Sequence, residues 1–212
     1  EWIDFWWGAQ RPGARTISYY APVDTIPVFV KSGSIIPMNL NSSYEIGGSI
    51  GNDLGSYNNI TFRVYPDGNT TYDWYDYVNS VTRTISASEK FKENKIEITI
   101  PQIDITSTLQ VFASKPSSVE VDAVALTEYS SFAAFQSANT GWYYDSEKLL
   151  AYIKLDPGSE RTVIIDGVNK APYEAEFAVH NNVAVDTDHI DYMGTGFVDQ
   201  FETQGDSVEF DI

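Results

Sequence analysis

Residues 26–38, IPVFVKSGSIIPM, carry the clearest secondary-structure pattern in the chain. Ile26, Val28 and Val30 recur at the two-residue period of a β-strand, and the Ser-Gly-Ser sequence at 32–34 breaks the run before a second apolar segment. The two prolines lack an amide hydrogen, so they belong at strand ends, edges or bulges. The pattern therefore predicts two short buried strands around a turn.

Similar short strands are expected further along the chain. Between residues 60 and 168, alternating segments are separated by turn residues such as Pro-Asp-Gly-Asn at 66–69, a spacing typical of an all-β sandwich. Only residues 130–137 suggest a helical turn. The expected strands are 61–65, 70–77, 81–86, 95–100, 108–113, 118–121, 149–155 and 162–165.

Two polar segments divide the chain into three parts. Residues 40–59 are rich in glycine, and residues 166–172 have the composition of a linker. We therefore expect an all-β fold of tandem β-sandwich domains, with one domain at 1–55, a second at 56–168, and a linker with a truncated third sandwich at 169–212.

The composition narrows the classes of partner. The 212 residues include 30 acidic and 13 basic side chains, which gives a formal net charge of −17. This charge repels phosphate backbones and argues against nucleic acid as a partner. No apolar run approaches the roughly 18 residues of a membrane-spanning helix, so no membrane partner is expected. Cysteine is absent, which excludes disulfides and thiolate metal sites.

The N-terminal phrases resemble a known enzyme family. EWIDFWWG at 1–8 and TISYYAPVDTIPVFVKSGSIIPM at 16–38 are similar to the segment that follows the catalytic barrel in glycoside hydrolase family 31, which includes α-glucosidases, α-xylosidases and α-glucosyltransferases. Trp7 stands where the family usually has Thr, and Lys31 where it often has Arg. The resemblance implies that residues 1–55 are the later part of a proximal β-sandwich and that residues 56–168 are the distal one.

The same resemblance implies a non-catalytic role for this part of the enzyme. A retaining glycosidase needs two carboxylates about 5 Å apart, and family 31 takes both from barrel loops that precede this region. We therefore assign no catalytic residue and no cofactor for catalysis, and we expect the fragment alone to be inactive. Because the chain begins with Glu inside a strand-like phrase, we interpret it as an internal region whose partner is the upstream barrel.

YEAE at 173–176, YMGTGFVD at 192–199 and GDSVEF at 205–210 are similar to the beginning of a carbohydrate-binding module of family 35. Glu174 and Glu176 alternate along an expected first strand, so both carboxylates project from one face and can share a hard cation. In such modules the matching glutamates contribute to a structural calcium site, which we expect in the intact module. The alternative is a solvated pair of acids, because calcium prefers about six to eight oxygen ligands.

Two aromatic groups are candidates for sugar recognition. Residues 74–77, Trp-Tyr-Asp-Tyr, and residues 142–144, Trp-Tyr-Tyr, offer ring faces to a carbohydrate, with Trp74 and Trp142 as the candidate binding residues. The alternative is packing, since alternation along a strand sends half of each group into the core. Both interpretations stay open at this point.

The sequence therefore predicts an accessory region of a family 31 α-glucosidase or α-glucosyltransferase. Its expected role is to support the catalytic barrel and to bind α-glucan or an oligosaccharide, and the resemblance extends to enzymes of the cycloalternan-forming type. An extracellular bacterial location is favoured. The alternative is a stand-alone, secreted carbohydrate-binding or adhesion protein made of tandem β-sandwiches.

Overall fold

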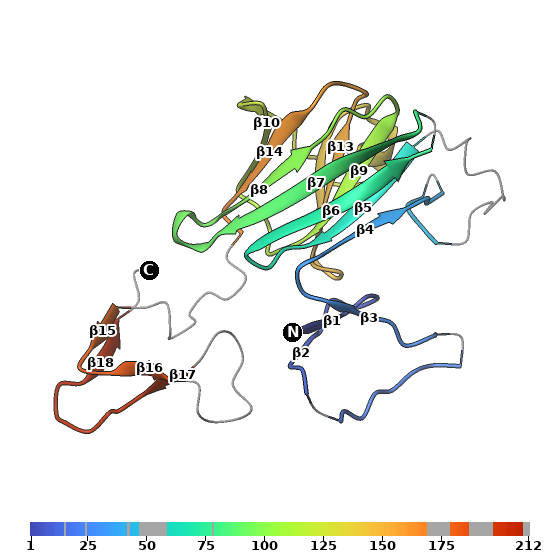
Figure 1. The fold of residues 1–212 in the computed structure, drawn as a ribbon. Helices are drawn as coiled ribbons and strands as arrows, with labels where there is room; N and C mark the ends of the chain where they lie inside the picture. Colours follow the sequence, from blue (N-terminus) through green and yellow to red (C-terminus); the bar gives the residue numbers. More distant parts are fainter. Residues whose placement is uncertain are drawn as a thin grey trace.

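The computed structural model describes residues 1–46, 59–168, 179–186 and 197–209, apart from Arg15, Asp24, Ser42 and Val78. The described chain is built mainly from strands, with one α-helix and one short 3-10 turn, η1 (Phe91–Glu93), in these ranges. This confirms the all-β fold class. Figure 1 shows two large sheets stacked face to face, with smaller sheets at the two ends of the chain.

The central sandwich consists of a five-stranded and a six-stranded sheet. The five-stranded sheet has the order β12-β13-β9-β5-β4, in which β5 and β9 are parallel and the other neighbours antiparallel. Its strands are β4 (Ser34–Met38), β5 (Asn59–Tyr65), β9 (Thr106–Phe112), β12 (Gly141–Asp145) and β13 (Leu150–Leu155). The six-stranded sheet has the order β11-β10-β14-β8-β7-β6 and contains β6 (Asn69–Asp76), β7 (Val81–Lys90), β8 (Lys95–Ile100), β10 (Ser118–Val121), β11 (Val124–Ala125) and β14 (Arg161–Asp166).

The central strands of the five-stranded sheet, β5, β9 and β13, are buried on both faces. The inner face of the sheet contributes side chains such as Phe62 and Ile153 to the sandwich core. Its outer face packs against the N-terminal sheet and helix α1 (Phe132–Ser137), and the side chains between them form a second core. The strands of the N-terminal sheet are β1 (Trp2–Asp4), β2 (Gln10–Arg11) and β3 (Phe29–Lys31), in the order β2-β1-β3. Because both faces are covered, every residue of β13 is buried and the alternation of a half-exposed strand is lost.

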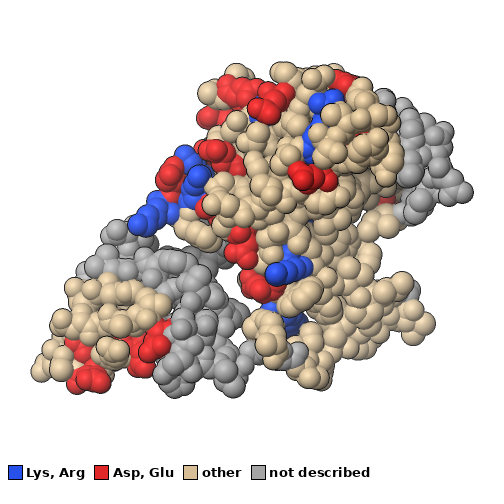
Figure 2. Space-filling view, viewed as in Figure 1, with Lys and Arg blue, Asp and Glu red and all other residues tan. Residues whose placement is uncertain are grey.

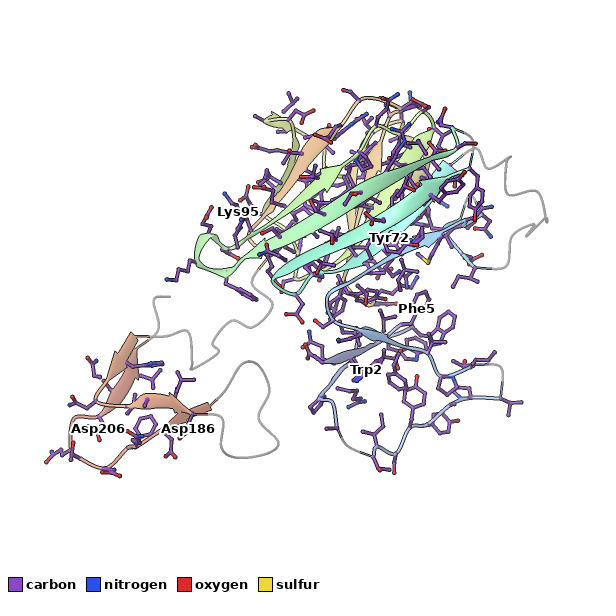
Figure 3. The ribbon with its side chains drawn as sticks, viewed as in Figure 1. Trp2, Phe5, Tyr72, Lys95, Asp186 and Asp206 are labelled. Atoms are coloured by element: carbon purple, nitrogen blue, oxygen red, sulfur yellow. The ribbon has the colours of Figure 1, made fainter. Side chains whose placement is uncertain are left out.

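The N-terminal sheet is tied to the sandwich by a buried cation. Arg63, on β5, donates from Nε to Oε1 of Gln110 at 2.7 Å and from Nη1 to the carbonyl of Phe5 at 3.2 Å. Its guanidinium lies 4.1 Å from the centroid of the Phe5 ring. Figure 3 shows Phe5 between the two layers. These contacts satisfy a charge that would be costly to bury without partners.

The segment at residues 26–38 is divided between two sheets. β3 joins the N-terminal sheet, whereas β4 pairs with β5 in the sandwich. The prediction of a buried strand from Ile26 is wrong, because Ile26 is 75% exposed. Pairing with β1 ends at Asp4, opposite Phe29, so β1 does not extend over the residues before Phe29.

Several expected strands are confirmed, and two of them, β8 and β10, have the predicted bounds. The helical turn at 130–137 is also confirmed as α1. Its N-cap is Ser131, whose hydroxyl accepts a hydrogen bond from the Ala134 amide. Sheet membership changes at the turn 32–33, upstream of the predicted domain division at 55 and 56. Strand pairing alone does not define a folding unit, so the three-domain division stays a prediction.

The C-terminal part contains two short antiparallel pairs. β15 (Val179–Asn181) pairs with β18 (Ser207–Glu209), and β16 (Ala184–Asp186) pairs with β17 (Phe197–Asp199). Glu174 and Glu176, like the expected linker at 169–172, lie outside the described residues. Among the residues that are described, no helix is long and apolar enough to cross a membrane.

Candidate functional site

A pocket opens at one side of the sandwich, between the two strands that end their sheets. β4 is the last strand of the five-stranded sheet and β6 is the last strand of the six-stranded sheet, and the two strands are in contact. The pocket has a volume of about 310 Å³, at the small end of the range for ligand sites. It is lined by Pro37, Met38, Asn39, Asn59, Ile60, Tyr72, Asp73, Trp74, Tyr75 and Tyr77.

The β6 side of the pocket is aromatic. Trp74 is only 6% exposed and packs edge-to-face against Phe62, with the ring centroids 5.6 Å apart. Tyr75 and Tyr77 are 44% and 51% exposed, and their rings meet edge-to-face at 4.8 Å. Figure 3 shows Tyr72 on the same strand. Alternation along β6 therefore sends Trp74 into the core and leaves the neighbouring tyrosines at the surface.

A buried carboxylate holds the turn that follows β6. Asp76 accepts hydrogen bonds from the Asn79 amide at 3.2 Å and from Asn79 Nδ2 at 2.8 Å, and its Oδ2 lies 3.2 Å from Arg83 Nε. Burial opposes ionisation of Asp76, but the hydrogen bonds from Asn79 and Arg83 outweigh this effect and lower its pKa. Asn79 also donates to Asp104 at 2.9 Å. The turn between Tyr75, Tyr77 and β7 is thus fixed by a polar network.

A second pocket, of about 300 Å³, contains Lys154 and the C-terminal end of α1. Lys154 Nζ donates to the carbonyls of Phe135, Gln136 and Ala138 at 2.9 to 3.0 Å. These are carbonyls that a helix leaves without partners at its C-terminal end. Burial lowers the pKa of Lys154. The cation is therefore used to cap the helix, which favours a structural role.

The two tryptophans predicted for sugar recognition lie in the core. Trp142 is 2% exposed and belongs to the same core cluster as Trp74. For Trp142 this placement favours packing over a sugar platform, because neither ring face reaches the surface. Trp74 differs in that it also lines the pocket beside β4. The two tryptophans were equivalent candidates in the sequence analysis, but only Trp74 lines this pocket.

The acidic candidates do not gather into a catalytic or metal site in the described residues. Each of the two pockets is lined by a single carboxylate, Asp73 in one and Asp156 in the other. Within the described ranges, no group of three or more His, Asp or Glu side chains is placed to hold a metal ion. Since Glu174 and Glu176 fall outside those ranges, their calcium site stays a prediction.

Asp4 has a structural role. Its Oδ1 accepts hydrogen bonds from the amides of Trp6 and Trp7 at 2.8 and 3.0 Å, and its Oδ2 accepts from the Tyr19 hydroxyl at 2.6 Å. The hydrogen bond to Asp4 is the main cause of a raised pKa at Tyr19. Through these contacts the Asp4 carboxylate holds the turn that follows β1.

Sequence reasoning missed the polar side of the β4–β6 pocket. Asn39 lies just after β4, Asn59 begins β5 and Asp73 is on β6, so the three residues come from separate parts of the chain. No motif links them, because only the contact between two sheet edges brings them together. The exposed tyrosines beside Trp74 could be found from strand alternation once the direction of Trp74 was known.

Comparison with known proteins matches the chain to one part of larger enzymes. No family model matches the sequence. An isomaltosyltransferase from Sporosarcina globispora is 55% identical over the whole chain, which spans 20% of that enzyme. The chain thus spans about a fifth of the length of this curated relative.

Solved structures agree with this relationship. A cycloalternan-forming enzyme from Listeria monocytogenes, in complex with a pentasaccharide substrate, matches the whole chain with a TM-score of 0.76 and 46% identity, over 20% of its own length. A glycoside hydrolase family 31 dextranase from Flavobacterium johnsoniae, complexed with glucose, shares the fold over 78% of this chain and 23% of its own, with a TM-score of 0.62 and 21% identity. The chain is therefore homologous to one part of an isomaltosyltransferase and of a cycloalternan-forming enzyme, and it shares its β-rich fold with part of a glycoside hydrolase family 31 dextranase.

Proposed function

We propose that the chain is the non-catalytic accessory region of an enzyme that hydrolyses or transfers α-glucosyl groups, and that it supports the catalytic domain of the same polypeptide. The observation that carries the proposal is its 55% identity, along the entire chain, to one fifth of an isomaltosyltransferase. A chain conserved to this degree with a small part of a large enzyme is best explained as a working part of a similar one.

The exposed surface of the N-terminal segment supports attachment to a further domain. Several large apolar side chains in residues 2–26 are exposed, among them Trp7, Val23, Ile26 and Tyr20, the last at 87%. Figure 2 shows that the surface formed by this segment carries few charged groups, whereas acidic groups spread over the sandwich. Several large apolar side chains exposed on one segment are typical of an interface. We assign it to the catalytic domain of the same polypeptide.

The proposal is tested by comparing the chain alone with the longer enzyme that contains it. We expect the chain alone to show no turnover of maltooligosaccharides or isomaltooligosaccharides. In the longer enzyme, Ile26→Ser and Trp7→Ser should lower the thermal unfolding temperature, while Val124→Ser, exposed on β11, serves as a control outside the interface. Turnover by the chain alone, or equal effects of all three changes, would contradict the proposal.

Two finer parts of the proposal concern ligands. We assign α-glucan or an α-gluco-oligosaccharide as the carbohydrate of the enzyme, in keeping with the pentasaccharide bound by the Listeria relative. We also propose the structural calcium at Glu174 and Glu176, within a carbohydrate-binding module of family 35, and an extracellular location. Calcium should raise the unfolding temperature of the enzyme carrying the complete module, and Glu174→Gln should abolish this rise. An unchanged temperature in calcium and in chelator would remove the metal site.

A further inference from the structure

We propose that the pocket between β4 and β6 is a carbohydrate-binding subsite that takes one or two units of an α-linked gluco-oligosaccharide. The choice of sugar rests on the proposed function, whereas the location of the site rests on the geometry of the pocket. The side chains that line the pocket come from β4, β5 and β6 and from the residues beside these strands.

The aromatic wall has the geometry that a pyranose ring needs. Tyr75 and Tyr77 extend from the same face of the β6 strand and its continuation, and both rings are about half exposed. Their edge-to-face contact orients the two rings nearly at right angles, with an interplanar angle of 86°. The apolar face of a sugar can therefore pack on one ring while its rim reaches the other.

The polar groups around the pocket are available for hydrogen bonding. The side-chain amides of Asn39 and Asn59, and the hydroxyls of Tyr75 and Tyr77, have no hydrogen-bond partner among the described residues. Asp73 contributes a carboxylate, of which Oδ1 accepts a hydrogen bond from Thr84 at 2.8 Å. A pocket that combines aromatic faces with a few convergent donors and acceptors is typical of sites for small polar ligands.

Trp74 forms the inner edge of the pocket and offers a further hydrogen-bond donor. Trp74 lines the pocket and is 6% exposed, and its indole N–H donates to no acceptor in the described part of the chain. Its Nε1 is not among the fully buried atoms that lack a partner, so the N–H keeps access to solvent. A sugar hydroxyl in the pocket can accept a hydrogen bond from this group.

The site is preorganised, which reduces the cost of binding. Asp76 and Asn79 fix the turn after β6, and the pairing of Trp74 with Arg83 and of Tyr75 with Thr82 fixes the strand itself. The tyrosines therefore lose little freedom when a ligand packs on them. Because β4 and β6 are both sheet edges, the pocket opens sideways and admits the end of a longer saccharide.

The test is a titration of the isotope-labelled chain followed by nuclear magnetic resonance. Maltotriose and isomaltotriose are the probes, and cellotriose is the β-linked comparison. We expect α-linked sugars to shift the Trp74 indole N–H resonance, which is identified by its absence in Trp74→Phe. Tyr75→Ala should weaken binding by about tenfold, because one stacked aromatic face is removed. Asn39→Ala is expected to weaken it by a smaller factor.

Tyr20→Ala is the matched control, because Tyr20 is an exposed tyrosine outside the pocket. It should leave the dissociation constant unchanged. Absence of a shift at Trp74 with every sugar, or an unchanged dissociation constant in Tyr75→Ala, would overturn the subsite. Preference for cellotriose would overturn its assignment to α-linked sugars. Cleavage of a probe during the titration would instead contradict the proposed function, because the accessory region would then be catalytic.

Discussion

The aromatic strands β6 and β12 have similar sequences but different surfaces. Both place a tryptophan in the sandwich core, Trp74 on β6 and Trp142 on β12. On β6 the next outward residue, Tyr75, is exposed to solvent. On β12 the corresponding Tyr143 is half-buried, because Phe132 and Phe135 of α1 lie at ring-centroid distances of 5.6 and 6.3 Å.

The difference shows that a strand pattern predicts which side chains face the core, but not whether the opposite face is free. The outer face of β12 is covered by a helix of six residues, and that helix is held in place by Lys154. β6 belongs to the other sheet, and its outward tyrosines remain open to ligand. Whether an aromatic side chain on a strand can contact a sugar therefore depends on whether another element covers the outer face of that strand.

The largest effect in this comparison is expected at the buried tryptophan of β12. Trp142→Ala should lower the free energy of unfolding by about 3 to 5 kcal/mol, because it leaves a large cavity in the core between the two sheets. Urea denaturation monitored by circular dichroism measures the change. A loss below about 1 kcal/mol would contradict its assignment to the packed core.

A smaller effect is expected when helix α1, which covers the outer face of β12, loses the hydrogen bonds at its C-terminal end. Lys154→Met should cost about 1 to 3 kcal/mol, because three carbonyls at the end of α1 lose their donor. Lys148→Met is the matched control, since Lys148 is exposed and its ion pair with Asp145 spans 3.6 Å. Its cost should stay below about 0.5 kcal/mol. Equal costs in the two variants would refute the capping role.

The free energy of unfolding should also fall at alkaline pH, because Tyr152 is buried on the covered face of the five-stranded sheet. Burial raises the pKa of Tyr152 from 10.0 to about 12. The folded protein therefore retains a proton that the unfolded chain releases, and stability is lost as pH rises from about 10 to about 12. Each such tyrosine contributes a slope of at most about 1.4 kcal/mol per pH unit.

Stability measured by urea denaturation across this range checks the prediction. Tyr152→Phe should reduce the slope, although Tyr44 and Tyr65, whose pKa values are also raised mainly by burial, keep part of it. Stability that is constant up to pH 12, or an unchanged slope in the variant, would show that Tyr152 is not responsible.

The smallest effect on stability is expected at the open tyrosines of β6. Tyr75→Ala removes the edge-to-face contact with Tyr77 at 4.8 Å, which is worth about 0.5 to 1.5 kcal/mol at most and less where both rings are solvated. Thermal unfolding should therefore stay close to that of the unchanged chain. A cost as large as that of Trp142→Ala would contradict the placement of Tyr75 at the surface.

Much of the fold follows from local patterns. The strands at Lys95–Ile100 and Ser118–Val121 appear as predicted, because alternation and turn residues act over a few positions. The family resemblance was likewise carried by contiguous phrases in residues 1–38 and is supported by the relatives. The exposed Ile26 was not predicted, because burial at that position depends on a partner strand that ends at Asp4.

The site illustrates the limit of local patterns. Strand period and turn chemistry depend on neighbouring residues, and net charge depends on composition, so all three can be read from the sequence. They predicted an acidic all-β accessory region. The pocket needed Asn39, Asn59 and Trp74 to meet at the edges of two sheets, and the burial of Tyr143 needed a helix folded over its strand. Such contacts join residues far apart in sequence, and they arise only when the sheets pack and bury their apolar faces.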